Sequence, residues 1–126
     1  MPYELKIETA FAAAHNLLNY CGQCENLHGH NWKIEIYIQG TELDKSGMLL
    51  DFKILKEHTN AILDRLDHTY LNELPIFTGK SPSSELIAEY IFIELEKKLA
   101  QLPVQVVKII AWESEKAAAA YFRQSS

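Results

Sequence analysis

The sequence predicts an α+β domain in which strands at both ends of the chain enclose two helices, in the order ββααββ. Apolar and polar residues alternate with the period of a strand over 3–13 and 32–39, whereas apolar residues recur at helical spacing over 52–66 and 81–99. Strands grouped at the two ends favour an antiparallel sheet with both helices on one face. We expect one domain covering residues 1–126, because that length suits a single hydrophobic core.

The first two strands are expected to form a long hairpin. Each has one apolar face, which is made of Tyr3, Leu5, Ile7 and Phe11 in the first strand and of Trp32, Ile34, Ile36 and Ile38 in the second. Polar residues occupy the opposite faces, as in half-buried strands. The loop from Asn16 to Leu27 joins the two strands and contains Cys21 and Cys24.

Two helices are expected to follow the hairpin. Asp51 is placed to cap a helix over 52–66, because a carboxylate oxygen accepts hydrogen bonds from the free N–H groups of the first turn. Ser81 and Pro82 open the second helix, with the proline at a tolerated first-turn position, and Pro103 ends it.

The last two strands are predicted over 104–113 and 117–122. The first of them is apolar on both faces, which carry Val107, Ile109 and Ala111 on one side and Ile110 and Trp112 on the other. A strand that helices cover on one face only should be polar on the other. We therefore expect another subunit to bury the face that no helix covers.

Composition and charge exclude several classes of protein. Hydrophobic residues make up 48% of the chain and its formal net charge is −5, so a disordered chain is excluded and nucleic acid is not expected as the partner. No apolar run is long enough for a membrane span and the N-terminus lacks a signal-peptide pattern, so we expect a cytoplasmic protein without a membrane partner. In a reducing compartment, Cys21 and Cys24 are interpreted as thiols or ligands rather than as a disulfide.

Three histidines form a candidate metal site. Residues two apart in an extended chain project to the same side, so the imidazoles of His28 and His30 can reach one ion. A hairpin that folds near Gly22 places His15 opposite this pair, on the face that carries Phe11. Three neutral imidazoles suit Zn²⁺ and leave a fourth position for water or substrate, which is the arrangement of a catalytic site.

A structural zinc knuckle is the alternative interpretation. It would use four closely spaced ligands, namely Cys21, Cys24, His28 and His30. Such a module would serve folding or partner binding rather than catalysis. The gap between its histidines is shorter than the roughly three to five residues that structural fingers use. It also leaves His15 without a role, so the catalytic interpretation is favoured.

Several short motifs occur in order along the chain. They are Phe11-Ala12-Ala13-Ala14-His15, Cys24-Glu25-Asn26-Leu27-His28-Gly29-His30, Gly47-Met48-Leu49-Leu50-Asp51-Phe52, Leu66-Asp67-His68, Pro82-Ser83-Ser84-Glu85 and the strand-ending Glu113. In this conjunction they resemble the motifs of the 6-pyruvoyltetrahydropterin synthase and 6-carboxytetrahydropterin synthase family, whose second branch belongs to the queuosine pathway. The resemblance covers nearly the whole chain. Ser83 stands where the family usually has threonine, and it keeps the hydroxyl.

The resemblance implies a tunnelling fold, in which ββααββ subunits pool their sheets into an oligomeric barrel. The common assembly is a homohexamer, a dimer of trimers. The implied activity is that of a carbon–carbon lyase with a small-molecule substrate, the dihydropterin triphosphate 7,8-dihydroneopterin triphosphate. In the carboxy-forming branch the products are 6-carboxy-5,6,7,8-tetrahydropterin, acetaldehyde and triphosphate.

The resemblance also implies roles for single residues. His15, His28 and His30 would hold Zn²⁺, which makes the substrate's side-chain hydroxyls more acidic. Cys24 would move protons at the side-chain carbon, since the pKa of a thiol lies near neutrality and a nearby cation lowers it.

A second acid–base unit would consist of Asp67 and His68, with the carboxylate orienting the imidazole. Glu113 would anchor the pterin by accepting hydrogen bonds from its amino-pyrimidine edge. The substrate-binding pocket would be completed at the start of the second helix by Ser83, Ser84 and Glu85. In the family these groups meet at a subunit boundary. No role is implied for Cys21 or His58.

Two other products stay open. Glu25 directly follows Cys24. A relative within the family uses a glutamate near this place to form 6-hydroxymethyl-7,8-dihydropterin for folate. The mammalian-type activity forms 6-pyruvoyltetrahydropterin instead, and the sequence alone does not separate the three reactions.

Overall fold

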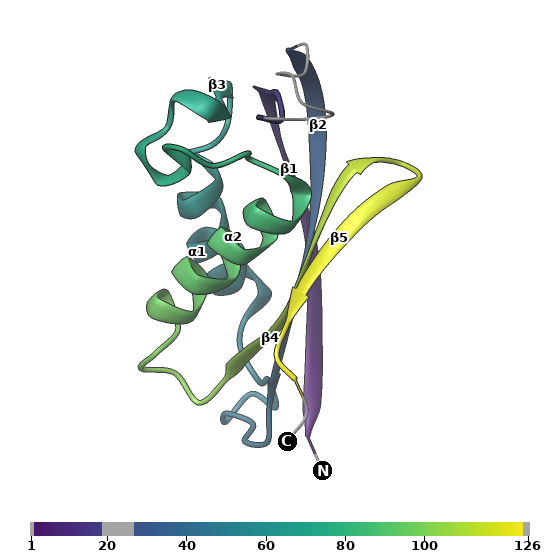
Figure 1. Ribbon diagram of the computed structural model, residues 1–126. Helices are drawn as coiled ribbons and strands as arrows, with labels where there is room; N and C mark the ends of the chain where they lie inside the picture. Colours follow the sequence, from purple (N-terminus) through teal and green to yellow (C-terminus); the bar gives the residue numbers. More distant parts are fainter. Residues whose placement is uncertain (1, 19–26, 125–126) are drawn as a thin grey trace.

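The computed structural model of the chain describes residues 2–18 and 27–124, apart from the side chain of His28. Figure 1 shows a long twisted sheet with α1 (Phe52–Leu63) and α2 (Ser84–Lys98) packed on the same face of it. This arrangement confirms the predicted α+β class with both helices on one side.

The sheet has the strand order β3-β1-β2-β4-β5. Its members are β1 (Tyr3–His15), β2 (His28–Gly40), β3 (Thr69–Tyr70), β4 (Gln105–Ser114) and β5 (Ala117–Phe122). Neighbouring strands are antiparallel, except that β3 runs parallel to β1. The expectation of an antiparallel sheet was therefore wrong in this respect, and the sheet is mixed. A strand as short as β3 has no alternation that the sequence could reveal, and it forms because the connection between the helices passes along β1.

The first helix begins where the sequence predicted and ends earlier. The Asp51 carboxylate accepts a hydrogen bond of 2.9 Å from the backbone N–H of Lys53, which is an N-cap. The predicted end at Leu66 was wrong, because the N–H groups of Arg65 and Leu66 bond to carbonyls three residues earlier. This tighter pattern closes the helix at Leu63.

The second helix begins after the predicted Ser81-Pro82 pair. Its cap is Ser83, whose hydroxyl accepts a hydrogen bond of 3.2 Å from the N–H of Leu86. Ser81 and Pro82 therefore precede the helix instead of opening it. Two short 3₁₀ turns, Leu71–Glu73 and Pro75–Phe77, lead from β3 toward this point. No helix within residues 2–18 and 27–124 is long and apolar enough to cross a membrane.

The core lies between the helices and the apolar face of β2. Four side chains of β2 are 0% exposed, and these are Trp32, Ile34, Ile36 and Ile38. The helices bury their own apolar stripes against this face, including Leu55, Ile62, Ile87, Ile91 and Leu95. Burial of each such side chain contributes about 1.5–3 kcal/mol, so this layer holds the histidine-bearing strands in a rigid frame.

A β-bulge changes the phase of β4. Tyr37 pairs with Lys108 but Ile38 pairs with Val106, so Val107 is the extra residue. Val106 is consequently buried with Ile109, at 1% and 0% exposed, while Val107 is only half-buried. The prediction that Val107 shares the face of Ile109 was therefore wrong, because an extra residue reverses the alternation at that point.

The face of the sheet that no helix covers holds a buried carboxylate. Glu35 is 6% exposed and accepts hydrogen bonds from the hydroxyl of Tyr37 at 2.7 Å and the indole N–H of Trp112 at 3.0 Å. The ammonium groups of Lys6 and Lys33 lie 3.8 and 3.6 Å from it. Desolvation alone raises the pKa of Glu35, but the two hydrogen bonds and the lysine charges outweigh it and hold that pKa below the ordinary value.

Candidate metal centre and active site

The ends of β1 and β2 carry the histidines. The register pairs His15 with His28 and Ala13 with His30. Residues opposite each other in an antiparallel pair share a face, as do residues two apart along one strand, so His15 and His30 share a face of the sheet. The hairpin thus brings two of the three predicted ligands together. It also sets the backbone of His28 beside that of His15, while the side chain of His28 lies outside what the structure describes.

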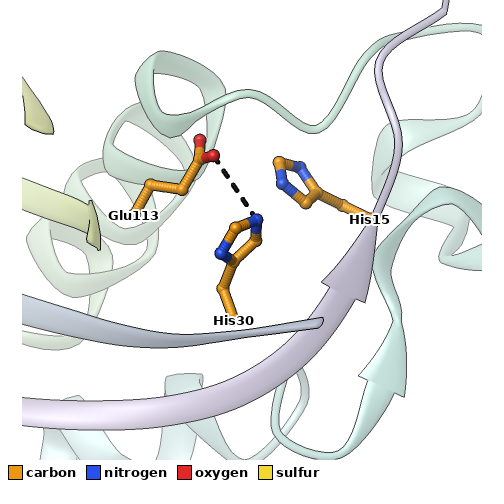
Figure 2. Close-up of side chains that lie close together, drawn as sticks. All are labelled: His15, His30 and Glu113. Carbon is orange, nitrogen blue, oxygen red and sulfur yellow. Dashed lines mark ion pairs between the residues drawn. The ribbon is translucent and has the colours of Figure 1, made fainter. Parts of the chain in front are cut away.

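Figure 2 shows the side chains of His15, His30 and Glu113 converging. Their ligand atoms all lie within 4.8 Å of one another. His30 Nε2 is 3.4 Å from Glu113 Oε1. Ligands of a tetrahedral zinc ion lie roughly 3.4 Å apart, given bonds of about 2.0–2.1 Å. The group therefore comes close to the spacing that one ion requires.

The donor set suits zinc. Imidazole nitrogens with a carboxylate oxygen are ligands of Zn²⁺ in proteins, whereas Ca²⁺ and Mg²⁺ sites are built from oxygens. His15 and His30 belong to the predicted set of His15, His28 and His30. Glu113 was not predicted as a ligand, and in the structure it lies within reach of the same ion.

A second bulge in β4 brings Glu113 to this place. Trp112 pairs with Ala118 and Ser114 pairs with Ala117, so Glu113 is the extra residue between them. Bulges are common beside active sites because they change the direction of a side chain. Ser84, in the first turn of α2, places its hydroxyl 3.5 Å from Glu113 Oε2. The carboxylate is 40% exposed and can also face a bound substrate.

The imidazole of His15 is held from two sides. Its side chain is buried, and Nδ1 lies 2.9 Å from the carbonyl oxygen of Pro82. A proton on Nδ1 that is donated to this carbonyl leaves the lone pair of Nε2 for a metal ion. Trp32 meets both imidazoles edge-on, with ring centroids 5.0 Å from His15 and 5.6 Å from His30. The ring of Phe11 stacks on that of Trp32 with 6.0 Å between the centroids, so the indole beneath the two imidazoles is itself held by packing.

Asp67 and His68 form a pair beside β1. His68 Nδ1 lies 2.9 Å from Asp67 Oδ2, and Asp67 Oδ1 accepts a hydrogen bond of 2.9 Å from the N–H of Ala12. The N–H of Ala12 is the main cause that lowers the pKa of Asp67, and His68 lowers it further. His68 is exposed and has a φ of 58°, which is uncommon for a residue other than glycine. The metal-ligand group of His15, His30 and Glu113 does not include this pair.

The start of α2 contributes unequally to the site. The hydroxyl of Ser83 caps the helix, and that of Ser84 faces Glu113. Glu85 is an exposed first-turn residue. The predicted proton carrier Cys24, its neighbour Glu25 and Cys21 lie outside the described residues, and the structure does not test the zinc-knuckle alternative that needs the two thiols.

Sequence reasoning did not find two parts of the site. The Pro82 carbonyl belongs to the backbone, so no residue type marks it. Trp32 was assigned to the core from its place in the strand, and the sequence could have shown its closeness to His30 because the two are two residues apart.

The chain matches a known protein family over nearly its whole length. A family model described as 6-pyruvoyl tetrahydropterin synthase matches residues 4–124. A 6-carboxy-5,6,7,8-tetrahydropterin synthase of Synechocystis sp. is 39% identical over 95 residues, which are 71% of this chain and 72% of that protein. A protein of the same name from Bacillus subtilis is 31% identical over 105 residues, with 79% and 70% of the two chains covered.

Solved structures agree with these sequence matches. The structure of Caenorhabditis elegans 6-pyruvoyl tetrahydropterin synthase superposes with a TM-score of 0.82 at 25% identity, and covers 98% of this chain and 97% of that chain. A 6-pyruvoyl tetrahydropterin synthase from Plasmodium vivax also gives 0.82, at 23% identity, which supports the fold alone.

Proposed function

The chain belongs to the 6-pyruvoyl tetrahydropterin synthase family, and we propose that it is a zinc-dependent 6-carboxytetrahydropterin synthase. In this proposal 7,8-dihydroneopterin triphosphate and water give 6-carboxy-5,6,7,8-tetrahydropterin, acetaldehyde and triphosphate, an early step of queuosine biosynthesis. The observation that carries the proposal is the convergence of His15, His30 and Glu113 at the end of the hairpin. The names of the relatives at 31–39% identity favour the carboxy-forming branch.

We assign the metal to His15, His28 and His30. The buried His15 is oriented by Pro82, and His30 is packed against Trp32. When bound, zinc supplies Lewis acidity toward the side-chain oxygens of the substrate. Two roles remain for Glu113, since its carboxylate is partly exposed and also lies 3.4 Å from His30. We propose that it accepts hydrogen bonds from the pterin ring, and a role as metal ligand is the competing one.

Protons are moved by Cys24 and by the Asp67–His68 pair in this proposal. The Asp67 carboxylate lies 2.9 Å from His68 Nδ1, so it can orient the imidazole ring. The exposed imidazole can then give or take a proton at Nε2. Cys24 would act at the carbon of the side chain, because a thiolate forms readily near a cation.

The pocket for the pterin would lie at the start of α2. Ser84, whose hydroxyl is 3.5 Å from Glu113, is the best placed of the three predicted pocket residues. The hydroxyl of Ser83 already caps the helix, so we assign it to shaping the pocket. Glu85 is exposed at the first turn and would meet the ligand from the rim.

We further propose a cytoplasmic homohexamer, a dimer of trimers. His68 is exposed in the single chain, and the metal-ligand group does not include the Asp67–His68 pair. A neighbouring subunit would bring its own pair to this metal site. The half-buried Ile110 and Trp112, on the face without helices, would be covered in the same assembly.

The deciding experiment is product analysis. Purified zinc-loaded protein is incubated with 7,8-dihydroneopterin triphosphate, and pterins and aldehydes are separated by chromatography and identified by mass spectrometry. Acetaldehyde with 6-carboxytetrahydropterin is expected. 6-Pyruvoyltetrahydropterin as the end product would assign the biopterin branch instead, and 6-hydroxymethyl-7,8-dihydropterin would assign the folate branch through Glu25. If zinc-loaded protein turns over no dihydropterin, the enzyme proposal fails and a structural zinc module becomes the better interpretation.

A further inference from the structure

The chain that leaves β1 after His15 is held by two side chains from distant parts of the sequence. The Asn72 amide makes two bonds with the backbone of Asn16: its Oδ1 accepts from the N–H at 2.9 Å, and its Nδ2 donates to the carbonyl at 2.8 Å. The Ser81 hydroxyl likewise makes two hydrogen bonds with the backbone of Leu18. It accepts from the N–H at 2.7 Å and donates to the carbonyl at 3.3 Å.

These contacts replace a strand partner. The ladder between β1 and β2 ends at the pair His15–His28, so the backbone of Asn16 and Leu18 has no further ladder bonds with β2. Partly buried backbone groups need hydrogen-bond partners, and an amide or a hydroxyl can both donate and accept. Tyr70 adds a third support by donating its hydroxyl to Asn16 Oδ1 at 2.5 Å.

The same region also holds the ring of His15. Ser81 is the residue before Pro82, whose carbonyl oxygen lies 2.9 Å from His15 Nδ1. The residue that fixes the backbone three positions after His15 is thus covalently joined to the carbonyl that orients the imidazole. The imidazole of His15 and the backbone that follows it are therefore both held by the segment Ser81-Pro82.

We propose that Asn72 and Ser81 are positioning residues of the metal centre, which clamp the segment 16–18 so that His15 directs Nε2 to the ion. The inference rests on the proposed zinc site and adds residues for which no role was expected. Without the clamp, the end of β1 and the Pro82 carbonyl shift independently. The imidazole then loses its fixed direction, and the ion loses a pre-oriented ligand.

The test is the affinity of the full chain for zinc, measured by competition with a chromogenic chelator. Ser81→Ala removes both bonds to Leu18, and Asn72→Asp keeps the acceptor for the Asn16 N–H but removes the donor. Loss of a group that orients a metal ligand typically weakens binding about 10–100-fold, and we expect that range for each variant. The absorption bands of the Co²⁺-substituted protein should change in the same variants, because they report ligand geometry.

Two controls separate positioning from general stability. Ser81→Thr keeps the hydroxyl and should restore zinc affinity. Thr9 lies on β1, as His15 does, and donates a side-chain hydrogen bond to Asn60 of α1. Thr9→Ala removes this bond away from the site and should leave the affinity unchanged. Denaturant unfolding of the metal-free proteins shows how much stability each variant loses.

Two results would overturn the clamp while leaving the zinc site in place. One is zinc affinity within about twofold of wild type in both Ser81→Ala and Asn72→Asp, because loss of a group that orients a metal ligand should weaken binding more than this. Another is an equal loss of affinity in Thr9→Ala. If Ser81→Ala does not fold, Asn72→Asp alone decides by the same criterion. If the wild type does not bind zinc, both the proposed function and the clamp are refuted. If the wild type and the variants bind zinc equally well, only the clamp is refuted.

Discussion

The imidazole Nδ1 of His15 lies 2.9 Å from the carbonyl oxygen of Pro82, a contact that joins the end of β1 to the segment before α2. It settles which ring nitrogen faces the metal-ligand group, because the nitrogen that is hydrogen-bonded to a carbonyl carries the proton. The loop before a helix, rather than the sheet alone, therefore orients this candidate ligand.

Purified protein should contain about one zinc ion per chain, as an open three-ligand site binds one ion. His15→Ala should lose both the metal and the activity, since it removes a buried ligand. Elemental analysis after dialysis measures the metal content. Cys21→Ala is the control and should keep zinc and activity. Retention of zinc in His15→Ala together with its loss in Cys21→Ala would favour the zinc knuckle.

Glu113→Gln should weaken the binding of a dihydropterin analogue about 10–100-fold, the loss expected for a charge-assisted hydrogen bond of about 1.5–3 kcal/mol. The variant replaces a purely accepting carboxylate by an amide that turns a donor toward the ring. Fluorescence titration measures analogue binding, and chelator competition measures zinc. If the variant loses zinc to the same degree as His15→Ala, Glu113 is a metal ligand rather than the pterin anchor.

Cys24→Ala should lower the turnover of the dihydropterin triphosphate about 10²–10⁴-fold, the usual contribution of a positioned proton carrier. Zinc content and analogue binding should stay as in the wild type, because the thiol is not assigned to either. Steady-state kinetics with product detection gives the rate. Loss of zinc in Cys24→Ala would place the thiol in the metal site and contradict this assignment.

Glu35 should make stability depend on pH. Its pKa in the folded chain is lower than the ordinary 4.5, so its charge stabilises the fold above that value. The contribution disappears as the pH falls through the lower, folded-state pKa. Glu35→Gln should therefore be less stable than the wild type near neutral pH, and the difference should shrink in acid. Urea unfolding at several pH values measures this, with Glu4→Gln on the exposed part of the sheet as the control. A difference that is independent of pH would contradict the account.

The protein should be a homo-oligomer larger than a dimer. In this proposal a neighbouring chain contacts the exposed His68. It also covers Ile110 and Trp112, which lie on the face of the sheet without helices. Light scattering at micromolar concentration measures the mass. A clean monomer that is nevertheless fully active would show that one chain completes the site alone.

Much of the framework could be read from the sequence, because it depends on local pattern. The alternation around Trp32 and Ile34 set the buried face of β2, and the phase of His15 with Phe11 set the side of the sheet on which the metal group lies. Asp51 revealed the start of α1 through its capping chemistry. Assignment of Cys24 to proton transfer stays a prediction, since it lies outside the described residues.

Only the tertiary structure decided how the site is assembled. The two bulges of β4 reversed its alternation at Val107 and turned Glu113 toward His30. The support of His15 came from Pro82, and the parallel strand β3 formed along β1. These features arise where segments far apart in the chain satisfy each other's backbone hydrogen bonds. Such pairing depends on how the whole chain packs, and periodicity within one segment carries no record of it.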